Sequence, residues 1–465
     1  MKNIKYFLLS FLIIVLFSKY SFAQMILPNV SSEREIATNT INSVMPIKTA
    51  NWDDNHIVSL VHYGSNKYTT GEFFTQGDIL YYNDACGVSV FYLTTVGTNT
   101  TKRVIIGNNT ITDFCIVDDT IYMCGQNSAG NNFVAYENIN IFFNVANNSP
   151  LFIYPISLSN IQNATLTNID FCISQGQPRL FLLANDNQMN GAFICYDILQ
   201  NSSGFNPYRI YYTIGCRLLD VVHTNNYIAV LGMKEDSIFT LTRHPLNNIS
   251  AYIGKEFITG QLYTHFLDPK YHLATLRKDL NHVVVAASTS NAEKLEFHVI
   301  NLGNLSILHT QTILDSREGR SKIIDLEFDE QRGLLYCLFC SGFYVRDIIM
   351  RMNPYSTQSY TALISKPQTY SAGYNLLKDL TLYGDNSQLL TLGRTPGLNI
   401  YFFDRKYNFN LTSSCDQIDG LHCGTITRST TINPFNYTTI NNQVVIQPQQ
   451  ISLNKNTINY NVICQ

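Results

Sequence analysis

Charge is scarce and evenly balanced in this sequence. Charged residues make up 14% of the 465 positions, with 31 Lys and Arg against 34 Asp and Glu, and no basic run or stripe occurs. A protein that binds nucleic acid needs massed Lys and Arg to neutralise phosphates, so we expect no nucleic-acid partner. Beyond the N-terminus, no apolar stretch approaches the roughly 20 residues that a membrane-spanning helix needs. The sequence therefore predicts no transmembrane segment once a signal peptide has been removed.

The motifs of common catalytic and ligand-binding sites are also missing. The sequence has no Gly-rich phosphate loop, no Gly-x-Ser-x-Gly elbow and no His-x-x-x-His or Glu-x-x-His pair that would gather a metal. The segment from Asp186 to Asp197 loosely resembles a calcium loop, but its Asn190-Gly191 dipeptide favours a plain hairpin. We therefore predict no catalytic set, no cofactor-binding residues, no cofactor and no metal site.

The N-terminus has the pattern of a secretory signal peptide. Two lysines precede a largely apolar run over residues 6–17, and Ser21-Phe22-Ala23 supplies small residues at the −3 and −1 positions of a cleavage site. A membrane anchor is the alternative, but this run is shorter than a bilayer-spanning helix. We predict a signal peptide over residues 1–23, cleavage before Gln24, and a secreted, periplasmic or cell-surface location.

What the sequence does contain is abundant Tyr, Phe, Thr, Ile and Asn, which favours strands joined by Asn-rich turns. A unit recurs along the chain: an Asp before an apolar residue, a polar turn, an apolar run and a further strand. Five units keep the Asp, at intervals of about 50 to 57 residues except for one double interval: Asp113, Asp170, Asp220, Asp325 and Asp379. Tyr271-His-Leu-Ala-Thr-Leu fills the long interval without an Asp, and His56-Ile-Val-Ser-Leu-Val begins a further unit upstream.

The second strand of each unit is a short run that is apolar on both faces, such as Leu180-Phe-Leu-Leu-Ala. Such runs fit strands that are covered on two sides. Seven units of about 50 residues with three or four strands each resemble the blades of a β-propeller, over residues 51–410. The resemblance is to the superfamily alone, because the sequence has no Trp-Asp blade ending, no paired-glycine kelch signature and no sialidase box. It implies an all-β chain that forms a single, seven-bladed propeller. Tandem β-sandwiches are the alternative, but they would need about 100 residues per domain.

Two flanking segments are candidates for closing the ring. Residues 24–50 could donate a closing strand, since closure removes exposed sheet edges. Residues 411–465 form a C-terminal β tail that either closes the ring or makes a small appendage, because short runs within it alternate as strands do.

Eleven cysteines leave at least one unpaired within a monomer. Cys415 and Cys423 form the candidate disulfide, because they flank a short polar loop. Cys337 and Cys340 have the spacing of a redox motif, but both lie in a predicted strand and are expected to be core residues.

The five repeated Asp residues are predicted to be structural. A carboxylate that recurs in five units is expected to cap a turn by accepting hydrogen bonds from backbone N–H groups, whereas catalysis requires unlike residues in unlike roles. The sequence therefore favours an exported, non-catalytic binding or scaffold propeller that recognises a protein or a glycan. The alternative is an enzyme that acts on an extracellular polysaccharide or other polymer. It would need two unlike titratable groups, from different blades, within reach of one substrate bond.

Overall fold

The computed structural model describes residues 32–38, 44–53, 56–63, 67–70, 79–82, 86–92, 100–106, 109–144, 146, 149–198, 206–235, 238–258, 271–288, 294–315, 322–341, 346–356, 360–364, 376–383, 388–395, 400–406, 421–424, 431–446 and 448–464. All of them belong to one compact unit, Ser32–Gln465. The predicted signal peptide, residues 1–23, lies outside the described residues. Among the described residues, no helix is long and apolar enough to cross a membrane.

Four groups of strands each fold as an antiparallel meander, in which every strand pairs with the next one along the chain. Tight turns join them; Gln175 and Gly176, between the first two strands of one meander, both have positive φ angles, as in the turns that match strand twist. The strands are β12 (Thr165–Ser174), β13 (Gln177–Asn185), β14 (Gly191–Asp197) and β15 (Asn206–Thr213); β16 (Arg217–His223), β17 (Tyr227–Glu235), β18 (Ile238–Pro245) and β19 (Ile253–Ile258); β20 (Tyr271–Arg277), β21 (His282–Ser288), β22 (Lys294–Asn301) and β23 (Ser306–Asp315); and β24 (Lys322–Asp329), β25 (Leu334–Ser341), β26 (Arg346–Met352) and β27 (Tyr360–Ile364).

Three further meanders are joined into one 13-stranded sheet by the long strand β34 (Gln449–Cys464), which pairs with an outer strand of each. Their strands are β2 (Val44–Asp53), β3 (His56–Tyr63), β6 (Cys86–Tyr92) and β7 (Thr100–Ile105); β8 (Thr110–Val117), β9 (Thr120–Gln126), β10 (Asn132–Asn138) and β11 (Ser149–Ile156); and β28 (Leu376–Tyr383), β29 (Gln388–Thr395), β30 (Ile400–Lys406) and β1 (Ser32–Thr38). A hairpin of β4 (Lys67–Thr70) and β5 (Ile79–Tyr82) lies between β3 and β6 in the chain, and the short helix α2 (Ile139–Asn144) follows β10.

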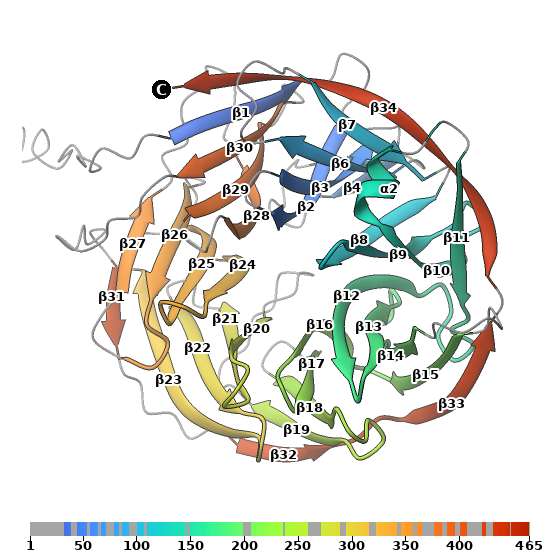
Figure 1. The fold of residues 1–465 in the computed structure, drawn as a ribbon. Helices are drawn as coiled ribbons and strands as arrows, with labels where there is room; N and C mark the ends of the chain where they lie inside the picture. Colours follow the sequence, from blue (N-terminus) through green and yellow to red (C-terminus); the bar gives the residue numbers. More distant parts are fainter. Residues whose placement is uncertain are drawn as a thin grey trace, which may run out of the picture. The chain divides into compact units, whose positions relative to one another are not determined.

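The first strands of the meanders contact one another in chain order: β2, β8, β12, β16, β20, β24 and β28. β28 in turn contacts β2, so the succession closes on itself (Figure 1). Meanders arranged in a closed succession around their first strands make a β-propeller. The predicted all-β propeller is thereby confirmed over the alternative of tandem sandwiches. The number of sheets does not establish the predicted count of seven blades, because β34 merges three meanders into one hydrogen-bonded sheet.

The two ends of this unit both add strands to sheet edges. β1 pairs with β30 and with β34, and so takes the outer place in the meander that begins with β28. The propeller's first meander begins with β2 at Val44, before residue 51. β1 therefore joins the N-terminal segment to the last meander of the chain.

The C-terminal residues form a belt, which we define as β31 (Leu421–Gly424), β32 (Thr431–Phe435), β33 (Thr439–Ile446) and β34. β31 pairs with β23, β32 with β19, β33 with β15, and β34 with β11, β7 and β1. The belt therefore passes the meanders in the reverse of chain order and adds an outer strand to each one that it meets (Figure 1). It supplies hydrogen-bonding partners for edges that would otherwise be open to pairing with other chains.

The core lies between neighbouring sheets. In β13, the run Leu180-Phe181-Leu182-Leu183-Ala184 is completely buried. Leu180, Leu182 and Ala184 pack toward the preceding meander, and Phe181 and Leu183 pack toward the following one. The prediction that such runs are covered on both faces is confirmed.

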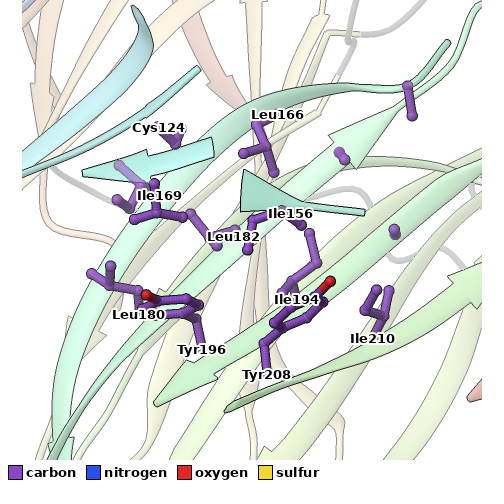
Figure 2. Packing of buried hydrophobic residues seen from close by; sticks show 14 of the residues in the cluster. Cys124, Ile156, Leu166, Ile169, Leu180, Leu182, Ile194, Tyr196, Tyr208 and Ile210 are labelled. Carbon is purple, nitrogen blue, oxygen red and sulfur yellow. The ribbon is translucent and has the colours of Figure 1, made fainter. Parts of the chain in front are cut away.

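Figure 2 shows one of these layers, between the β8 and β12 meanders. Its labelled members are Cys124, Ile156, Leu166, Ile169, Leu180, Leu182, Ile194, Tyr196, Tyr208 and Ile210. Full burial of one such aliphatic side chain stabilises a fold by about 1.5–3 kcal/mol, so these layers are the main force that holds neighbouring meanders together.

A side chain between β32 and β33 of the belt is fixed in the core by a hydrogen-bonded network. The hydroxyl of Tyr437 lies 3.0 Å from Nε2 of His244 and 2.9 Å from the hydroxyl of Thr242. Nδ1 of His244 is 2.8 Å from the carbonyl of Ile249 and donates to it, so Nε2 accepts from Tyr437. His244 is fully buried, and desolvation lowers its pKa to about 4. The imidazole is therefore neutral at ordinary pH.

Candidate functional site

The five repeated Asp residues all lie inside first strands. Asp113, Asp220, Asp325 and Asp379 each directly follow an irregularity in the register between the first and second strands of their meander. In β12 the irregularity precedes Asn168, two residues before Asp170. A bulge of this kind re-aims the residues beside it. The residues are thus placed in bulged strands, whereas the expectation from sequence was a turn cap.

In the four whose side chains are described, Oδ1 accepts a hydrogen bond from the next backbone N–H. The distances are 2.9 Å for Asp113 and 2.8 Å for Asp170, Asp220 and Asp325. This bond fixes the rotamer of the carboxylate, and in Asp113, Asp170 and Asp220 the second oxygen contacts the neighbouring first strand.

Oδ2 then links two meanders. Oδ2 of Asp113 accepts from the N–H of Ile169 in β12 at 2.9 Å, and Oδ2 of Asp220 accepts from the N–H of Leu273 in β20 at 3.2 Å. Ile169 directly precedes Asp170, and Leu273 directly precedes Ala274, which therefore occupies the Asp position in the unit that lacks one. Hydrogen bonds to an ionised acceptor are stronger than neutral ones, which gives the recurrence of the Asp a structural reason.

Asp170 departs from this pattern. Its Oδ2 lies 2.7 Å from Nδ1 of His223, the last residue of β16. The side chains of Asp170 and His223 are 22% and 24% exposed. The hydroxyl of Thr275 in β20 donates to the backbone carbonyl of His223 at 2.9 Å, so three first strands meet there. Two unlike titratable groups from different meanders are thus in direct contact.

The contact defines the proton positions on the imidazole. Asp170 accepts from Nδ1–H, which leaves the lone pair of Nε2 as a hydrogen-bond acceptor when the ring is neutral. No described residue forms a hydrogen bond with Nε2 of His223. Sequence analysis missed this residue, although comparing the units by position would have singled it out.

A second acid and histidine pair lies in β22 and is buried. Oε2 of Glu296 is 3.5 Å from Nε2 of His298, and each side chain is 3% exposed. Nδ1 of His298 lies 3.1 Å from the hydroxyl of Thr310, and the ring packs against Phe239. Because both groups come from one strand and are covered, they differ from the partly exposed contact between Asp170 and His223.

The segment that loosely resembled a calcium loop is a hairpin. Asn185 pairs with Gly191 across the turn, and Oδ1 of Asp186 accepts from the N–H groups of Gln188 and Asn190. Asp197 lies at the other end of the sheet, 2.6 Å from the guanidinium of Arg179. Among the described residues, no group of three or more His, Cys, Asp or Glu is placed to hold a metal.

The candidate disulfide stays a prediction. Cys415 lies outside the described residues, and Cys423 lies in β31, where its backbone pairs with Ile313. The thiol of Cys337 is buried, and desolvation raises its pKa well above the usual value. A thiol held neutral in this way is unreactive.

Comparisons with known proteins find similar solved structures but no family. No family model matches the chain, and no curated protein matches it. It is similar to prolyl oligopeptidase B from Galerina marginata bound to a 35mer substrate, at 10% identity and a TM-score of 0.41, over 76% of this chain and 46% of that one. It is also similar to Drosophila semaphorin 2a (10% identity, TM-score 0.41, 82% and 75% of the two chains) and to the WD40 domain of SCAP from fission yeast (9%, 0.35, 92% and 98%).

The chain spans about half the length of the prolyl oligopeptidase structures it matches. One fold hosts many unrelated functions, so these similarities say nothing about what the chain does. The class of the protein is a β-propeller because its meanders close on themselves, and its function has to be argued from its own residues.

Proposed function

We propose that this β-propeller is an exported, non-catalytic binding or scaffold protein that recognises a protein or a glycan. The observation that supports this is how the repeated carboxylates are used. Asp113 and Asp220 each have both oxygens bonded to backbone N–H groups of first strands. Carboxylates engaged in this way join sheets and are poorly placed to exchange protons with a substrate. Recognition then falls to connecting segments and to exposed side chains on this rigid scaffold.

Export is the part of the proposal that depends on the N-terminus. Expression of the full chain in a secreting host, followed by N-terminal sequencing of the exported protein, tests it. We expect the mature chain to begin at Gln24. A cell-associated chain that still begins at Met1 would refute export without affecting the propeller.

Binding is tested with the mature chain, residues 24–465, against immobilised glycans and purified extracellular proteins. We expect saturable binding of at least one ligand, with the ligand recovered unchanged by mass spectrometry. Release of shortened or modified ligand over time would contradict the non-catalytic role.

An enzyme acting on an extracellular polymer is the second candidate, and the contact between Asp170 and His223 is the observation that favours it. Glycoside hydrolysis commonly uses two carboxyl groups that flank the scissile bond, about 5 to 9.5 Å apart, whereas here the acid is bonded to the base. An assay for newly formed reducing ends, with His223→Ile as the control, distinguishes the two candidates. Release of ends by the natural chain that His223→Ile abolishes would establish the enzyme.

A further inference from the structure

We propose that His223 is a ligand-binding residue, whose Nε2 accepts a hydrogen bond from a hydroxyl group of a neutral glycan. This inference rests on the proposed binding function and specifies its site, the junction of β12 and β16. At the contact between Asp170 and His223, both the residue type and the hydrogen bonding differ from those in the other Asp-bearing units.

The departure in sequence appears when the units are compared at the third residue after the Asp. That position is apolar in the other four Asp-bearing units, where the residues are Ile116, Ile173, Phe328 and Leu382. In the β16 unit it is His223. Packing does not require an apolar residue at this position, because Ile173 is 63% exposed and Arg277 occupies the equivalent place in the β20 unit. What sets His223 apart is therefore its contact with Asp170.

The departure in bonding concerns the Oδ2 of Asp170. Asp113 and Asp220 use this oxygen to accept from the N–H of the residue before the next repeat position. In β16 the equivalent N–H belongs to Leu219. Asp170 instead accepts from His223 at 2.7 Å. The imidazole is therefore held in one orientation by a carboxylate that elsewhere has a backbone partner.

The chemistry of the contact indicates the class of ligand. With Nδ1–H given to Asp170, Nε2 offers a lone pair, and hydroxyl groups are matching donors. The adjacent carboxylate disfavours an anionic group at the same place. The side chain is 24% exposed, so the contact is open to a group from outside the chain, and a single hydroxyl is the smallest donor that fits. A neutral sugar hydroxyl meets all three conditions.

The test compares the natural chain with His223→Ile, which installs the residue found at this position in the β12 unit. Ile173 is 63% exposed at the equivalent place, so an isoleucine can be accommodated there and the variant should remain folded. The matched control is Asp220→Asn, which weakens a link between first strands without touching His223. Binding is measured by calorimetry against neutral oligosaccharides, with sulfated dextran and purified extracellular proteins as the comparison ligands.

We expect His223→Ile to bind the neutral oligosaccharide about tenfold more weakly, the loss of roughly one hydrogen bond, and Asp220→Asn to bind it as the natural chain does. Equal affinity of His223→Ile would overturn the inference and leave the proposed function standing, as would a natural chain that binds only proteins or sulfated dextran. A natural chain that binds none of these ligands would refute both.

A second measurement does not depend on the ligand or on the folding of His223→Ile. Nitrogen-15 NMR of the neutral imidazole should show a proton on Nδ1 and none on Nε2, with a mixture of tautomers in Asp170→Asn. On addition of the oligosaccharide, the Nε2 resonance should shift. An Nε2 resonance that does not respond to a bound oligosaccharide would exclude contact with His223.

Discussion

Acid should destabilise this propeller through His244, which holds the belt in place. The pKa of His244 falls from 6.5 to about 4 on burial, because the charged ring would lose its hydration. Between these values the unfolded chain binds a proton that the folded chain does not. Stability is therefore complete above pH 6.5, declines as the pH falls toward 4, and levels off below it with respect to this group.

The magnitude follows from the shift. At about 1.4 kcal/mol for each pKa unit, the fall from 6.5 to about 4 costs the folded state about 3 kcal/mol. Burial is the main cause of this fall, and the contact with Tyr437, which donates to Nε2, leaves no acceptor for a further proton. A proton on Nε2 would remove that acceptor and place two donors face to face.

The assay is urea unfolding from pH 7.5 to pH 4, followed by circular dichroism, for the natural chain and for His244→Phe. Phenylalanine fits the surrounding aromatic cluster and cannot be protonated. At pH 7.5 we expect the variant to be less stable by about 1–2 kcal/mol, since the hydrogen bonds to Ile249 and Tyr437 are lost. This deficit should reverse near pH 4.

The matched control is His282→Gln, at a histidine that is only partly buried. Other groups titrate in the same range, so the decisive quantity is the difference between the natural chain and each variant. That difference should change by about 3 kcal/mol for His244→Phe and by much less for His282→Gln. A difference that stays constant from pH 7.5 to 4 would refute the argument.

Three further predictions concern the scaffold. Asp113→Asn should lower the free energy of unfolding by about 1–2 kcal/mol, because it weakens a charge-assisted link between β8 and β12; urea unfolding at pH 7.5 measures this. Gly125→Ala should lower the free energy of unfolding by several kcal/mol or prevent folding, because the bulge in β8 brings the carbonyl of Thr110 within 1.9 Å of the new Cβ. In the control Gly130→Ala, nothing lies within 4 Å of the new Cβ, so the free energy of unfolding should fall by only about 1 kcal/mol for the positive φ. Cys216, whose pKa burial raises to about 11, should react with a thiol reagent at pH 8 only after denaturant is added, and rapid labelling of the native chain would count against its burial.

The strands of the propeller could be predicted because their signal is local. The run from Leu180 to Ala184 is apolar at every position, and only a strand covered on both faces accommodates that pattern. The recurrence of such runs every 50 or so residues then indicates blades. Neither inference requires knowing which residues meet across the structure.

The belt could not be predicted in the same way. Alternation in the C-terminal residues indicates strands, but short alternating segments do not specify a partner. β33 pairs with β15 and β32 with β19, more than 170 residues earlier in the chain. The anchoring residue Tyr437 lies between two of these strands, and nothing in its neighbourhood points to His244.

His223 could have been found from the sequence, but only by comparing the repeated units with one another. The repeated Asp is readily interpreted as structural, and Asp113 and Asp220 have the backbone partners that this role requires. That interpretation does not predict the behaviour of Asp170, which has the same sequence context but a different hydrogen-bond partner. The difference lies 53 residues along the chain, at a position whose equivalents in the other Asp-bearing units are apolar. In a repeat scaffold the informative comparison is therefore between units, at each position in turn. That comparison singles out His223, because it alone among these equivalents bonds to a repeated Asp through its side chain.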